Sequence, residues 1–367
     1  MRQVSIDACM RIVVLFGVAL AVTLSTGAAR ADGTMVAPKG WDGTVEEFAQ
    51  NAIIIFHASD TPGDATEDLI LQIRVKGNTR RFAWVIPFPN VPKTAPEDAK
   101  LFDELYRYVA LRQSARVTKK PGTKSTGGAF AAEAERKPVE VISRRVVGKY
   151  DVAIVRENVA GALNKWLGKE GYETLGDAED VIGFYREKKY VFACIKVSDA
   201  ELQRGGVADL HPLRFTFKTG GRDGVYFPMK MTGLQFKPFD VNLYVFYRYW
   251  LNDHRSRYGY EHRGFTLHYR DWDTTRCRPN GGKAWSLPQL DPFLKNHARR
   301  LPEVAKLFQK LHPGDTYYLT NLRARALKPQ AVRAWVDDLW LFPYYTDPKM
   351  VPFDARAGGV ASGAYHR

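Results

Sequence analysis

The pattern of apolar and polar residues along the chain predicts short β-strands that alternate with brief helices. β-Branched and aromatic residues, which favour strands, concentrate in residues 52–57, 69–75, 81–88, 139–147, 150–155, 190–197, 213–218, 225–231, 241–248, 265–269 and 316–323. Apolar residues recur at helical spacing in residues 97–111, in segments that Asn158 and Asp177 begin as caps, and in residues 299–311. Such a pattern predicts an α+β fold with a largely antiparallel sheet, in one layer or two, and several short packing helices.

Alternation along residues 241–248 assigns the side chains of one strand to two faces. One face carries Val241, Leu243, Val245 and Tyr247, and the other carries Asn242, Tyr244, Phe246 and Arg248. Because aromatic rings bury large areas, we expect another layer of the same protein to cover the second face. On a neighbouring apolar run, His57 stands alone, and we interpret it as a core histidine with satisfied hydrogen bonds.

The first 31 residues have the organisation of a cleavable signal peptide. Arg2 and Arg11 precede an uncharged apolar run at residues 12–24, and Ala29-Arg30-Ala31 supplies the small-x-small pattern of a cleavage site. The run is shorter than the roughly 20 residues that a spanning helix needs, so an uncleaved anchor is the weaker alternative. We therefore predict export to the periplasm or beyond the cell, and no transmembrane segment in the mature chain.

The remaining chain is expected to form one α+β domain over residues 32–346, followed by a disordered tail at 347–367. Within it, residues 113–137 have no sustained period and are predicted to be a flexible basic loop. The formal net charge of +14 marks a basic protein and attracts polyanions. We expect an anionic envelope component or another envelope protein as partner, and no nucleic acid, since no reading motif is present.

Two cysteines remain after removal of the signal segment. An oxidising compartment permits a disulfide between Cys194 and Cys277. The first of them, however, lies in a run that resembles a buried strand, where cysteine behaves as a small apolar residue. The sequence does not decide between this disulfide and two unbridged cysteines.

Several segments resemble, in order, the domain-of-unknown-function 2330 family of exported bacterial proteins. They are residues 80–92 (RRFAWVIPFPNVP), 147–155 (VGKYDVAIV), 162–167 (ALNKWL), 190–197 (YVFACIKV), 210–217 (LHPLRFTF), 227–232 (FPMKMT) and 316–323 (TYYLTNLR). The chain departs from the family at Asp32-Gly-Thr-Met35, where many members have a Cys-Gly-Gly-Phe-type segment, so no role of those cysteines carries over. The resemblance implies export and a shared fold, and it implies no activity.

The sequence lacks the familiar motifs of hydrolases, zinc proteases and phosphate-binding loops. One alternative is a metal-dependent, hydrolytic enzyme that would hold a divalent metal through His254, His262, His268 and Asp271, since these residue types suit transition metals. Their spacing is irregular, however, and matches no known metal motif. We therefore prefer a non-catalytic binding or structural module of the cell envelope, with no cofactor.

An aromatic and arginine-rich segment is the predicted contact surface of that module. The residues assigned to it are Tyr244, Arg248, Trp250, Arg255 and Tyr258. Tyrosine, tryptophan and arginine are enriched at protein interfaces, which is the reason for this assignment.

Overall fold

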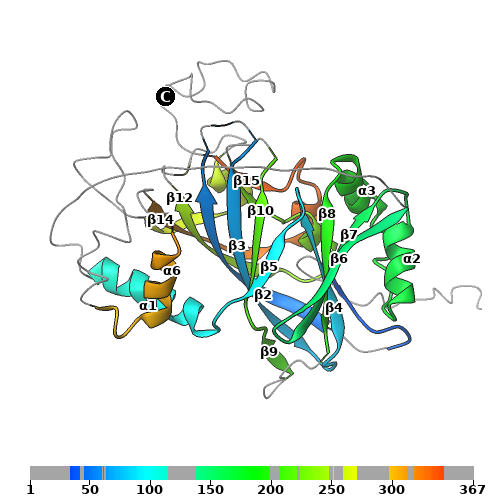
Figure 1. Ribbon diagram of the computed structural model, residues 1–367, viewed down its shortest axis with the longest axis horizontal. Coiled ribbons are helices and arrows are strands. Elements are labelled where there is room, and N and C mark those ends of the chain that lie inside the picture. Colours follow the sequence, from blue (N-terminus) through cyan, green and yellow to red (C-terminus); the bar gives the residue numbers. More distant parts are fainter. Residues whose placement is uncertain are drawn as a thin grey trace, which may run out of the picture.

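The computed structural model places two β-sheets face to face, with helices against the outer side of each (Figure 1). It describes residues 34–41, 45–59, 61, 63–114, 138–198, 206–220, 224–247, 251, 259–270, 297–311 and 317–342. The result is a layered α+β fold with mostly antiparallel strands, as the pattern of short strands predicts. Among the described helices, none combines the length and the apolar character needed to cross a bilayer.

The smaller sheet has five antiparallel strands. Their order is β1 (Thr34–Val36), β4 (Phe82–Phe88), β8 (Val191–Val197), β7 (Tyr150–Glu157) and β6 (Val139–Val147). Strands β4 and β8 are apolar and buried along nearly their whole length, because both of their faces are covered. Helices α2 (Ala162–Lys169) and α3 (Glu179–Glu187) cover the outer face, at the right of Figure 1.

The larger sheet has eight strands. Seven lie in the order β13 (Thr266–Arg270), β14 (Tyr318–Leu327), β12 (Phe239–Tyr247), β2 (Val45–His57), β3 (Thr66–Gly77), β10 (Leu213–Lys218) and β5 (Lys93–Pro96). The eighth, β9 (Val207–Asp209), pairs with β3. All of these pairs are antiparallel except the central β2–β12 pair, which is parallel.

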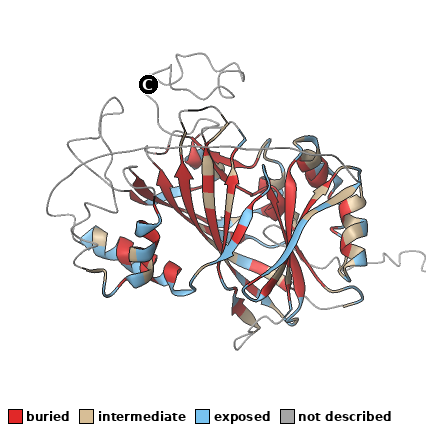
Figure 2. Cartoon of the chain, viewed as in Figure 1, coloured by how far each residue is buried: buried red, intermediate tan, exposed pale blue. Residues whose placement is uncertain are grey.

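Two apolar clusters stabilise the layers. The larger fills the space between the sheets and continues beneath α2 and α3, and buried residues accordingly concentrate in the strands in Figure 2. The smaller lies on the other face of the larger sheet, beneath α1 (Lys100–Ser114) and α6 (Pro302–Gln309). Strand β12 contributes Val241, Leu243, Val245 and Tyr247 to the first cluster and Tyr244 and Phe246 to the second. This confirms the predicted division of faces and the covering layer.

Short elements complete the described fold. Strands β11 (Val225–Phe227) and β15 (Leu339–Leu341) form a separate pair. The 3₁₀ turns η2 (Met231–Leu234) and η3 (Tyr260–Arg263) and helix α7 (Pro329–Arg333) lie in the connections. The predicted strand at 225–231 therefore ends early, and the chain turns into η2.

The predicted helix starts were wrong by a few residues, and backbone hydrogen bonds explain why. The amide of Asn158 donates to Pro138 O, so Asn158 belongs to the β6–β7 connection, and α2 begins only at Ala162 after Gly161 with a φ of 73°. Helix α1 begins at Lys100, where Asp98 Oδ1 accepts the Lys100 N–H at 2.8 Å. Its last residues, Gln113 and Ser114, were assigned to the flexible basic loop; the rest of that loop lies outside the described residues.

Candidate functional site

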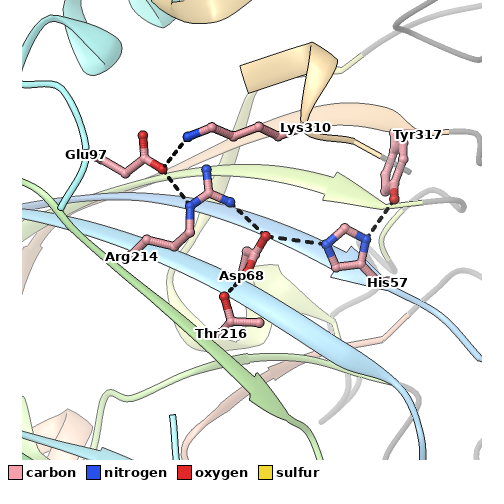
Figure 3. A network of polar contacts seen from close by, with 7 residues as sticks. All are labelled: His57, Asp68, Glu97, Arg214, Thr216, Lys310 and Tyr317. Carbon is pink, nitrogen blue, oxygen red and sulfur yellow. Dashed lines mark hydrogen bonds and ion pairs between the residues drawn. The ribbon is translucent and has the colours of Figure 1, made fainter. Parts of the chain in front are cut away.

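A network of polar side chains lies on the helix-covered face of the larger sheet, next to the smaller apolar cluster (Figure 3). We call it the His57 network; its members are His57, Asp68, Glu97, Arg214, Thr216, Lys310 and Tyr317. The strand register explains the assembly. Thr216 pairs with Asp68, and Arg214 pairs with Ile70, so their side chains share the face of the cluster residue Ile70.

His57 uses both of its ring nitrogens within the protein. Its Nδ1 lies 2.9 Å from the Tyr317 hydroxyl, and its Nε2 lies 3.5 Å from Asp68 Oδ2. His57 is 7% exposed and Tyr317 is 1% exposed. These contacts confirm the interpretation of His57 as a core histidine with satisfied hydrogen bonds.

Asp68 is the shared acceptor of the network. Burial alone would raise the pKa of Asp68, but hydrogen bonds from His57 and Thr216 and the charge of Arg214 outweigh it and lower the pKa to about 2. Arg214 Nη1 donates to Asp68 Oδ2 at 2.7 Å. The carboxylate is therefore ionised and fully occupied, which makes it an anchor between strands and a poor general base.

Arg214 extends the network to the helices. Its Nε donates to Glu97 Oε1 at 2.6 Å, and Lys310 Nζ, just after α6, donates to the same oxygen at 2.9 Å. The network thus ties α6 and the start of the α1 segment to the sheet. We assign it a structural role, because its acidic and basic groups are engaged with one another.

A second group of polar side chains crosses the same face on the other side of the apolar cluster. Five strands place Thr266, Arg323, Asn242, Asn51 and Gln72 directly opposite one another, strand by strand from β13 to β3. We call this line the cross-strand polar row. Thr266 is exposed and the other four are half-buried.

Hydrogen bonds fix the middle of the row. Asn242 Nδ2 donates to Asn51 Oδ1 at 3.2 Å. Asn321, which is not part of the row, donates through its Nδ2 to Asn242 Oδ1 at 2.7 Å. Arg323 Nε donates to the same Asn242 oxygen at 3.3 Å. One asparagine therefore holds both its neighbour and the arginine in place.

Arg323 is a cation without a carboxylate partner among the described residues. Its guanidinium lies 5.9 Å from the ring centre of Tyr106, a tyrosine of α1 that is 56% exposed. His268 stands nearby: partial burial and the charges of Arg323 and Arg325 lower the pKa of its imidazole. The edge formed by β13 and β14 therefore carries the positive charges of Arg323 and Arg325, which disfavour protonation of His268.

The predicted contact surface is corrected at one residue. The Tyr244 ring is 1% exposed and belongs to the smaller apolar cluster, so it cannot form a contact surface. Its hydroxyl interacts with Asn242 and Arg323, at the border of the polar row. Arg248, Trp250, Arg255 and Tyr258 lie outside the described residues.

The predicted metal ligands are only partly described. His262 lies in η3 and His268 in β13, and both are exposed. The part of the chain that the structure describes holds no group of three or more His, Cys, Asp or Glu residues able to bind a metal. His254 and Asp271 lie outside it, so the metal site stays a prediction.

The same holds for the disulfide and the terminal segments. Cys194 is buried in β8, and burial raises the pKa of its thiol. Its predicted partner Cys277 lies outside the described residues, so the disulfide stays a prediction. The signal segment at 1–31 and the tail at 347–367 lie outside them as well.

The sequence interpretation missed the polar row, although a signal was present. Asn51, Asn242 and Asn321 each lie within a predicted strand or beside one, and asparagine is depleted in strands. Residues that break local preferences often serve function. That the three lie side by side depends on strand order, which the periodicity of one strand does not contain.

Comparisons with known proteins identify a family for the chain but no activity. No curated protein matches it. A solved structure, "Crystal structure of baculovirus P35", aligns with 82% of this chain and 97% of its own at 11% identity, with a TM-score of 0.38, a similarity too low to support any argument. A family model described as "Uncharacterized protein conserved in bacteria (DUF2330)" matches residues 48–336. Since this match covers most of the sequence, the chain belongs to the domain-of-unknown-function 2330 family.

Proposed function

We propose that the protein is an exported, non-catalytic binding module of the cell envelope whose ligand is an anionic polymer. The observation that carries the proposal is the β13–β14 edge of the larger sheet, where Arg323 and Arg325 lie close enough together for both charges to act on His268 and lower the pKa of its imidazole. None of the three forms an ion pair with a carboxylate among the described residues.

Like charges held close together on a folded surface repel one another, and a bound anion relieves that repulsion. Elsewhere in the described structure, several arginines pair with acids, among them Arg144 with Asp151, Arg214 with Asp68, and Arg333 with Asp180. The β13–β14 edge differs from this pattern. The net charge of +14 adds a long-range attraction for polyanions, and the apolar run at 12–24 supports export.

Affinity electrophoresis tests the proposal. Polygalacturonate and polyglutamate should retard the protein, neutral dextran should not, and retardation should weaken between about 50 and about 500 mM salt because salt screens exposed charges. Arg323→Gln should weaken binding of both polyanions roughly two- to fivefold, the effect of one partly exposed charge pair.

Lys165→Gln is the matched control. It removes one positive charge from the exposed side of α2, on the opposite flank of the molecule. Equal losses in the two variants would show that only net charge matters, and no retardation by either polyanion would refute the proposed function.

A further inference from the structure

We infer that the cross-strand polar row is a binding site for a carboxylated saccharide. The inference rests on the proposed function and makes it specific, since it names a sugar with a carboxylate as the repeating unit of the anionic polymer. It draws on the hydrogen-bonding groups of the row, their spacing, and the arginine and tyrosine at its end.

The row has unused hydrogen-bonding groups. Asn51 accepts a hydrogen bond from Asn242 through Oδ1, while its Nδ2 has no partner among the described residues. The side-chain amide of Gln72 likewise has none there. Both are half-buried and can be reached from solvent. An amide offers a donor and an acceptor side by side, as a sugar hydroxyl does, so the two suit each other.

The spacing of the row suits an extended ligand. Neighbouring strands are about 4.8 Å apart, so five in-register side chains cover roughly 19 Å. Rigid strands, and not loops, hold every position. A linear oligosaccharide lying across the strands would meet a polar group at each one.

The arginine end provides the selectivity for acid. The guanidinium of Arg323 donates to Asn242 through Nε, and its forked geometry suits a carboxylate. Tyr106 presents an exposed ring beside it. An exposed aromatic ring next to hydrogen-bonding side chains is suited to packing against the apolar face of a sugar.

The asparagines of the row and next to it also reduce the stability of the sheet. Asparagine is disfavoured in strands, and Asn321 Oδ1, behind the row, is buried with no hydrogen-bond partner among the described residues. Asn321 Nδ2 nevertheless positions Asn242. A ligand-binding role gives this arrangement a function that packing alone does not.

A valine substitution separates binding from stability. Asn51→Val removes the amide from the row and the acceptor of Asn242 Nδ2, but it introduces a residue that strands prefer, so the two effects oppose each other and the melting temperature should change little. If the amides serve only to hold the sheet together, the same variant should melt lower. Asn90→Ala is the matched control, because it removes an exposed amide that bonds Lys218 O elsewhere.

The probes are tetragalacturonate, a neutral galactose tetrasaccharide and tetraglutamate, titrated calorimetrically into the protein. Asn51→Val should weaken tetragalacturonate binding roughly three- to tenfold, the effect of one or two hydrogen bonds, and should leave tetraglutamate binding within twofold. Arg323→Gln should weaken both acidic ligands, and Asn90→Ala neither. The neutral tetrasaccharide should bind more weakly than the acidic one.

The outcomes of these titrations distinguish the saccharide inference from the proposed function. If polyanions bind in an Arg323-dependent way while Asn51→Val and Asn90→Ala behave alike, the saccharide inference is wrong and the proposed function stands. Equal affinity for the neutral and acidic tetrasaccharides would overturn the assignment of a carboxylate. If no acidic ligand binds, the proposed function itself fails.

Discussion

Asp68 illustrates how one buried carboxylate organises its surroundings. It accepts hydrogen bonds from Thr216 and Arg214 and faces His57, so three residues on two neighbouring strands depend on it. Its side chain is 15% exposed, and that of Arg214 is 10% exposed. In such surroundings, removing one partner leaves the other charge without compensation.

Asp68→Asn should therefore lower the free energy of unfolding by about 3 kcal/mol, the lower end of values for broken buried pairs, since Arg214 keeps Glu97. Urea denaturation measures the change. Lys237→Gln, which breaks an exposed pair with Glu46, should have little effect. Similar losses in the two variants would contradict the assignment of Asp68 as an anchor.

The pH dependence of folding stability below about pH 4 follows from the carboxylate of Asp68. The folded protein lowers the pKa of Asp68 from 3.8 to about 2, so its contribution to stability is complete above about pH 4 and is lost as the pH falls through about 2. This acid-dependent component should be missing from the asparagine variant.

Among the secondary-structure elements, η2 and α7 are packed so closely that only glycine fits between them. A Cβ on Gly233 would lie 2.6 Å from the backbone nitrogen of Arg333. In contrast, a Cβ on Gly168, within α2, would meet no atom within 4 Å. Alanine at these two positions should therefore have opposite effects on stability.

Gly233→Ala should lower stability by about 1–3 kcal/mol through overpacking. Gly168→Ala should raise it by about 0.5–1 kcal/mol, because alanine restricts the unfolded chain and favours the helix. Thermal denaturation compares the two directly. A destabilising Gly168→Ala would show that α2 does not tolerate a side chain at that position.

Alternation and β-branched residues were sufficient to predict several elements from sequence. Strands β6 and β10 begin and end where the pattern of residues 139–147 and 213–218 placed them. The short strands β1, β5, β9 and β15 were missed, because three or four residues are too few to show a period. The predicted start of α2 was wrong because the carbonyl of Pro138, which lies far from Asn158 in sequence, accepts a hydrogen bond from the Asn158 amide.

Asp338 connects elements from distant parts of the chain. Its Oδ1 accepts from the Tyr185 hydroxyl of α3 and from the backbone amides of Met229 and Lys230, and its Oδ2 accepts from the Tyr226 hydroxyl of β11. Complete burial raises the pKa of Asp338 to about 6, although the hydrogen bonds oppose the shift. The folded protein therefore holds this proton more tightly than the unfolded chain does.

Because the folded pKa of Asp338 lies above the unfolded value of 3.8, its ionisation should reduce stability as the pH rises from about 4 to about 6. Asp338→Asn keeps an oxygen for the two amides and Tyr185 but does not titrate, so this decrease should disappear from urea denaturation curves measured across that range. Asp338→Ala should also lack this decrease, and it should lower the free energy of unfolding by about 3 kcal/mol at pH 4, where Asp338 of the folded wild type is protonated, since several buried donors lose their acceptor. Persistence of the decrease in the asparagine variant would exclude Asp338 as its origin.

The candidate site shows the limit of prediction from one sequence. Periodicity assigned Asn242 and Tyr244 to the same face and predicted that a layer would cover it, and both are correct. It did not indicate that Asn51 would lie beside Asn242, or that His57 would contact Tyr317, because each pair is far apart in sequence. Which strands become neighbours depends on the packing of the whole chain.

The parallel pairing of β2 with β12 also determines when the larger sheet can form. The centre of the larger sheet joins residues 45–57 to residues 239–247, and β14 adds residues 318–327 beside them. A ribosome must therefore synthesise most of the chain before this sheet can close, and contacts between such distant segments form slowly. The smaller sheet needs only residues 34–197, so it can close earlier in synthesis than the larger one.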